Sequence, residues 1–200
     1  MSPVSRRRLL WAGAVAGVGL VASVVAAHLT YPSDQTPEGA YYRIVIAINR
    51  DDPAQCFAYL ETAAQHACYT IRDYRKRARE RILAAYPESE QTELLARHAE
   101  EAGAPDGADV FALYARRLGW LKRLRRDLSG VGHVEVRGER ATVETARGTR
   151  YPFRRRENGI WGLTLFTAGL VAEAERAARD FALIERAASD YERARKAGGG

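Results

Sequence analysis

The sequence contains little cysteine, and its two cysteines form no recognisable metal or redox motif. Cys56 and Cys68 do not make a Cys-x-x-Cys pair, and no His-Glu-x-x-His motif is present, so there is no strong metal signature and we expect neither metal nor cofactor. If both lay on one continuous helix, their Cα atoms would be roughly 18 Å apart, which is too far for a disulfide. A disulfide therefore requires a chain break between them, and we expect two small buried side chains instead.

Lysine is also scarce, so the positive charge is almost entirely arginine. The 200-residue chain has a net charge of +6, and residues 28–200 keep +3 of it. The only lysines are Lys76, Lys122 and Lys196. This mild basicity comes without interleaved aromatic residues, so we expect no nucleic-acid binding. No internal repeat, proline-rich spacer or low-complexity tract divides the chain, and we therefore expect one domain.

The N-terminus carries a long apolar run behind three arginines. Arg6–Arg8 precede an uncharged stretch from Leu9 to Ala27, which approaches the roughly 20 apolar residues that span a bilayer. Basic residues on the N-terminal flank favour that end staying inside. We expect a single-pass anchor in the cell membrane, with the rest of the chain on the extracytoplasmic, periplasmic side.

Two alternatives concern the fate of this segment. Ser5-Arg6-Arg7-Arg8-Leu9-Leu10 resembles the twin-arginine export signal, although the usual Phe and Lys of that motif are here Leu9 and Trp11. The small residues Val25 and Ala27 suit a signal peptidase, which would release a soluble protein after cleavage of the signal peptide near Ala27. We divide the chain into a signal-anchor (1–28), a linker (29–35), one domain (36–197) and a disordered tail (198–200).

The first two-thirds of the domain has the period of amphipathic helices. Thr36-Pro37 is a helix start, and the apolar stripe that follows predicts a helix over 37–50. A second start at Asp51-Asp52-Pro53 leads into a stripe that ends near Ile82. This stretch fits one long helix or two, and we expect a break near Thr62 to Gln65 because its length exceeds the usual globular range. Further helices are predicted over 89–102, 106–128 and 167–195.

After Gly132 the period changes to two, which predicts strands. The four alternating stretches are His133–Arg137, Arg140–Ala146, Arg150–Arg156 and Ile160–Leu165. Their short connections, including Asn158-Gly159, permit only an antiparallel meander. We therefore expect an α+β fold in which the helices come first, the apolar face of a four-stranded meander packs against them, and a long C-terminal helix follows.

The order of these elements resembles the NTF2-like (SnoaL-like, cystatin-type α+β) superfamily. The residues that carry the resemblance are Val134, Gly138, Ala141, Val143, Gly148, Phe153, Asn158, Gly159, Trp161 and Leu163. The helical block over 65–128 and the long C-terminal helix depart from the family pattern. The resemblance implies a bent sheet that wraps helices into a cone with an apolar pocket, a scaffold used both by enzymes and by non-catalytic binding modules.

Three groups of side chains are candidates for a site. Tyr151, Phe153, Trp161 and Leu163 could line the cone pocket, although inward aromatic residues on a meander are more often core, which we expect. His66, Tyr69 and Asp73 could form a general base with an orienting acid, but they lie mostly opposite the apolar stripe, so we expect them to face water. Arg72, Arg75, Lys76 and Arg79 could hold anionic lipid headgroups or a polyanion, or could simply form a solvated helix face.

Three functions remain open at this stage, in the order in which we favour them. The first is a membrane-tethered, non-catalytic NTF2-like module of the envelope that binds a partner protein or a small apolar ligand. The second is an NTF2-like isomerase, dehydratase or hydrolase that uses the cone pocket. The third is anionic lipid or polyanion binding through the arginine-rich helices. The bilayer is an expected partner through residues 9–27, and the oligomeric state stays open.

Overall fold

A computed structural model describes residues 32–198 of the chain. The contacts place the start of the body described below at Asp34. The expected anchor over 9–27 and the last two residues lie outside the described range. None of the helices within 32–198 combines the length and the apolar character needed to cross a bilayer.

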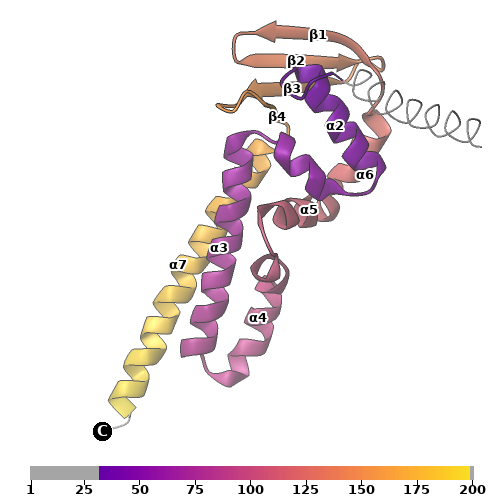
Figure 1. The fold of residues 1–200 in the computed structure, drawn as a ribbon. Coiled ribbons are helices and arrows are strands. Elements are labelled where there is room, and N and C mark those ends of the chain that lie inside the picture. The colour runs from indigo at the N-terminus through magenta and orange to yellow at the C-terminus, as the bar shows by residue number, and fades with distance from the viewer. Residues whose placement is uncertain (1–31, 199–200) are drawn as a thin grey trace, which may run out of the picture. The chain divides into compact units, whose positions relative to one another are not determined.

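The described body has an α+β fold, as the sequence predicts (Figure 1). Its elements in chain order are α2 (Pro37–Asn49), the 3-10 helix η1 (Pro53–Tyr59), α3 (Thr62–Ala85), α4 (Glu88–Gly103), α5 (Gly107–Arg117), α6 (Trp120–Asp127), β1 (Val131–Arg137), β2 (Arg140–Thr145), β3 (Arg150–Arg155), β4 (Trp161–Leu163) and α7 (Thr167–Gly198).

The four strands form the predicted meander. Their order is β1-β2-β3-β4, and every neighbouring pair is antiparallel. The turn into β4 contains Gly159 at φ +83°, a left-handed conformation that glycine adopts without strain. Val143, Tyr151 and Phe153 are buried on the face that packs against α2. The expected inward direction of the apolar face is confirmed for these residues, but it is wrong for Val136 and Leu165, which are 53% and 46% exposed.

The helical break after η1 lies a little earlier than the sequence predicts. Leu60 leaves the helix and forms a parallel bridge to Leu163 on β4, and the Glu61 amide donates a 3.1 Å hydrogen bond to the Leu163 carbonyl. A Cβ atom on Gly162 would lie 2.7 Å from backbone atoms of Leu60 and Glu61. The break therefore depends on a contact across about 100 residues, and neither proline nor glycine marks it locally.

The single helix expected over 106–128 is wrong, because the structure has two helices there. Leu118 and Gly119 separate α5 from α6, and Gly119 has a φ of +68°. The turn brings Leu121 and Leu124 into the core and stacks Trp120 on Phe166, with ring centroids 4.5 Å apart. The glycine was a visible signal, since a left-handed residue ends a helix at little cost.

The last helix packs along α3 rather than on the sheet. Arg75 on α3 pairs with Asp180 on α7, and Arg81 one and a half turns later pairs with Glu185, so the two helices run in the same direction. Figure 1 shows α3 between α4 and α7. The far halves of α3 and α7 share a small hydrophobic core around Ala78, Ile82 and Ile184, which is separate from the larger core under the sheet.

Candidate functional site

The structure does not bring the three candidate catalytic residues together. His66 is exposed and lines a groove between α3 and α7. Tyr69 turns toward η1, where its ring meets the edge of Phe57 at a centroid distance of 5.7 Å. Asp73 is exposed and forms an ion pair only with the adjacent Arg72, at 3.4 Å. A base with an orienting acid would need a hydrogen bond between the two groups, and the described contacts contain none among these residues.

The four aromatic and aliphatic candidates for a cone pocket lie in the packed core. Tyr151, Phe153, Trp161 and Leu163 are each no more than 5% exposed. The Tyr151 ring lies 5.4 Å from that of Tyr41, and burial raises the pKa of Tyr151 to about 12. The Trp161 indole donates to the Gln35 carbonyl at 3.1 Å. These side chains therefore fill the space under the sheet.

One of the four expected anionic-surface residues is not on the surface. Lys76 and Arg79 are exposed, and Arg72 donates to the Ala104 carbonyl at 2.8 Å. Arg75, however, is only 7% exposed and pairs with Asp180 on α7 at 2.7 Å. The expectation of a solvent-facing Arg75 is wrong, because a carboxylate 105 residues later covers it.

The clearest surface feature is a groove along the seam between α3 and α7. It has a volume of about 320 Å³, and its lining consists mainly of small side chains. The lining residues are Ala63, His66, Ala67, Thr70, Tyr74, Val171, Ala174, Glu175 and Ala178. The groove lies on the side of the α3–α7 pair away from α4, since Arg75 and Asp180, which line the α4 side, are absent from it.

An aromatic pair stands at one end of this groove. The Tyr74 and Phe181 rings lie 5.7 Å apart, and the Arg77 guanidinium carbon lies 4.4 Å from the Phe181 centroid. A second hollow of about 290 Å³ continues beyond them along the same two helices, and it is lined by Arg77, Glu80, Arg81, Ala84, Phe181 and Glu185. The groove therefore continues over several helical turns of both helices, and its second part is lined mainly by charged residues.

A buried polar cluster lies on the α4 side of the same helices. Glu101 accepts a 2.7 Å hydrogen bond from Arg117, and both Glu101 and His98 are less than 9% exposed. Burial and the nearby positive charge of Arg75 lower the pKa of His98. Burial acts to raise the pKa of Glu101, but the hydrogen bond and the charge of Arg117 prevail and lower it.

Sequence reasoning missed this cluster, although a signal was present. His98 and Glu101 continue the three-and-four spacing of Leu94 and so fall on the inward face of α4. The Nδ1 atom of His98 is buried without a hydrogen-bond partner among residues 32–198. No cavity of those described opens onto the cluster, so its chemistry serves the packing of four helices.

The described part of the chain offers no metal centre. No three His, Cys, Asp or Glu side chains within residues 32–198 converge on a common point. Cys56 and Cys68 are both free and buried, and burial raises each thiol pKa to about 12. Such thiols are unreactive at neutral pH, because only the thiolate is a nucleophile.

Comparison with known proteins adds no relative. No protein-family model matches the chain, and no curated protein and no solved structure resembles it closely enough to count as a match. The resemblance to the NTF2-like superfamily therefore stays a hypothesis, and the groove between α3 and α7 is the candidate functional site.

Proposed function

We propose that this chain is a membrane-tethered, non-catalytic binding module of a bacterial-type envelope. Residues 9–27 are the tether, and the domain lies on the extracytoplasmic side. The groove between α3 and α7 holds one amphipathic helix of a partner protein. The observation that carries the proposal is the alanine-lined groove between α3 and α7, which no part of residues 34–198 covers.

The shape of the seam favours a helix over a compact small molecule. Four alanines line the groove, and their small side chains leave room for another helix to approach closely: Ala63, Ala67, Ala174 and Ala178. Small residues at a helix contact allow the two helix axes to approach to about 8 Å. A drug-sized ligand fits an enclosed cavity, whereas here two hollows follow one another along the same pair of helices. A helix that lies along the seam would fill both.

The charged rims define the chemistry of the partner helix. The α3 rim carries His66, Arg77, Glu80 and Arg81, and the α7 rim carries Glu175 and Glu185. Arg81 is already paired with Glu185 at 3.0 Å, which leaves the α3 rim the more positive of the two. A helix with a central apolar stripe, acidic residues on the side toward α3 and basic residues on the side toward α7 would complement both rims. Complementary charge of this kind sets the orientation and the rate of docking more than the affinity.

The candidate catalytic residues do not form one group within the described residues. His66, Tyr69 and Asp73 point to different surroundings, and the aromatic residues under the sheet are packed. A general base needs its proton within hydrogen-bonding reach and an orienting partner, and within residues 32–198 no hydrogen bond joins the groove residues His66, Tyr74 and Glu175 to one another.

Site-specific photo-cross-linking of the full-length chain in its native membranes tests the proposal. A benzophenone amino acid replaces Ala178 in the groove, and a control replaces the exposed Ala99 on α4. We expect a discrete cross-linked species from position 178 only. The cross-linked peptide should be helical in pattern, with the apolar stripe and flanking charges described above. Identical products from both positions, or a peptide without that pattern, would overturn the proposal.

A further inference from the structure

The open face of the sheet carries a row of three arginine side chains. Arg137 on β1 is paired directly with Arg140 on β2, and Arg140 is paired directly with Arg154 on β3. All three are exposed, and the residues next to Arg140 and Arg154 on their strands, Ala141 and Phe153, are buried on the opposite face. Like charges directly opposite one another destabilise a sheet, so this row needs negative charge beside it.

The protein supplies that charge at the two ends of the row but not in the middle. Arg137 pairs with Glu135 at 2.5 Å, and Arg154 pairs with Glu61 at 3.0 Å. The Arg140 guanidinium has no hydrogen bond and no ion pair within the described residues 32–198. Its side chain is exposed between two other arginines, and no carboxylate of the described residues forms an ion pair with it.

A neighbouring row on the same face shows the contrast. His133, Glu144 and Arg150 lie opposite one another on β1, β2 and β3. There Arg150 pairs directly with Glu144 at 2.9 Å across the strands. That row is balanced by its own side chains, whereas the row centred on Arg140 is not.

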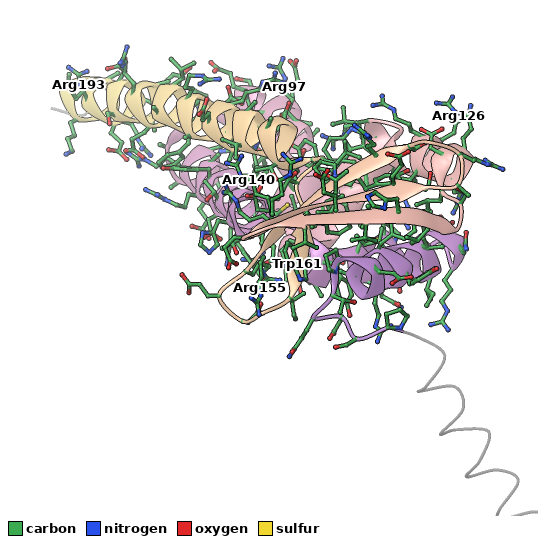
Figure 2. All side chains as sticks on the ribbon, turned by 90° about the horizontal axis from the view of Figure 1, so that it is seen from above. Arg97, Arg126, Arg140, Arg155, Trp161 and Arg193 are labelled. Atoms are coloured by element: carbon green, nitrogen blue, oxygen red, sulfur yellow. The ribbon has the colours of Figure 1, made fainter. Side chains whose placement is uncertain are left out.

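The arginine row lies at the end of the sheet where Arg154 is paired with Gly162 of β4. Figure 2 shows Arg140, Arg155 and Trp161 toward one end of the sheet and Arg126 toward the other. Trp161 donates to the Gln35 carbonyl at 3.1 Å, and the next residue, Gly162, is paired with Arg154.

We infer that Arg140, flanked by Arg137 and Arg154, binds a phosphate-type oxyanion, and that anionic phospholipid headgroups supply it. Guanidinium groups present paired N–H donors that match phosphate oxygens, and anionic leaflets attract arginine near their surface. The site orients the domain on the membrane. The inference rests on the proposed tether, but it is independent of the groove between α3 and α7.

An NMR titration of the full-length chain tests this site. The protein is held in zwitterionic phosphatidylcholine-type micelles, and the backbone amide of Arg140 and the indole N–H of Trp161 are followed. One arm adds the anionic phosphatidylglycerol-type detergent, and the other adds inorganic phosphate at constant ionic strength. We expect saturable shifts in both arms, with half-saturation at a lower concentration of the anionic lipid.

Substitutions identify the residues responsible. Arg140→Gln should weaken the lipid titration about fivefold, the effect of removing one arginine near an anionic surface. The control Arg179→Gln, at an exposed position on α7, should leave it unchanged. Equal effects of both substitutions, or no saturable shift with either ligand, would overturn the site. Saturation by inorganic phosphate without any preference for the lipid would overturn the headgroup as its source. Cross-linking from position 178 in the groove should persist in Arg140→Gln. Loss of lipid binding at Arg140 can therefore be distinguished from failure of the proposed partner site in the groove.

Discussion

Replacing Gly162 by alanine should destabilise the domain more than any other single methyl addition at its glycines away from the turns. The new Cβ would lie 2.7 Å from the Leu60 carbonyl oxygen and from the amide nitrogen and Cα of Glu61, all of them backbone atoms. Ordinary contact requires about 3.5 Å, so β4 and the start of α3 must separate.

The magnitude follows from what that separation breaks. Overpacking a tight site costs about 1–3 kcal/mol. The hydrogen bond from the Glu61 amide to the Leu163 carbonyl, 3.1 Å long, is lost as well, which adds about 1 kcal/mol. We expect the free energy of unfolding to fall by about 3 kcal/mol and the Tm to fall by about 6–12 °C for a domain of this size.

Thermal unfolding of the full-length chain in detergent, followed by circular dichroism, measures this effect. Gly130→Ala is the matched control, because a Cβ at Gly130 has no atom within 4 Å, and its Tm should change by less than about 2 °C. A Gly162→Ala variant that unfolds at the wild-type temperature would refute the close approach of β4 to the η1–α3 junction.

Two further predictions concern the buried polar cluster on the α4 side of α3. Arg75→Met should lower the free energy of unfolding by about 2 kcal/mol. This is less than for a fully buried ion pair, because the Asp180 side chain is 38% exposed. Denaturant unfolding measures the effect against the exposed control Arg179→Met, and equal stability of the two variants would contradict the prediction. Burial lowers the pKa of His98 in the fold, so the unfolded chain takes up its proton first as the pH falls. Stability should therefore be full above pH 6.5 and decline below it, by at most about 1.4 kcal/mol per pH unit. His98→Gln should flatten that decline just below pH 6.5, and an unchanged profile would show that His98 is not the group responsible.

Features that depend on neighbouring residues could be predicted from the sequence. The meander followed from alternation and from turn glycines such as Gly159, and both signals lie within a few residues of the strands they define. The start of α2 followed from Thr36, whose hydroxyl accepts the Gly39 amide at 3.1 Å. In these places local chemistry and the final fold agree.

Features that depend on distant contacts could not be predicted. The end of η1 is set by Leu163, and the burial of Arg75 is set by Asp180. The groove itself exists because α7 packs on α3. No local pattern identifies which surface a long amphipathic helix will choose.

Cysteine labelling in native membranes tests the central claim most directly. Ala178→Cys places a thiol in the groove, and Ala99→Cys places one on the exposed surface of α4. The natural cysteines contribute little background because both are buried with raised pKa values. If a partner helix fills the seam, a maleimide should label Ala178→Cys slowly in membranes and rapidly after purification, while Ala99→Cys reacts equally in both. Equally rapid labelling of Ala178→Cys in membranes and after purification would contradict the account.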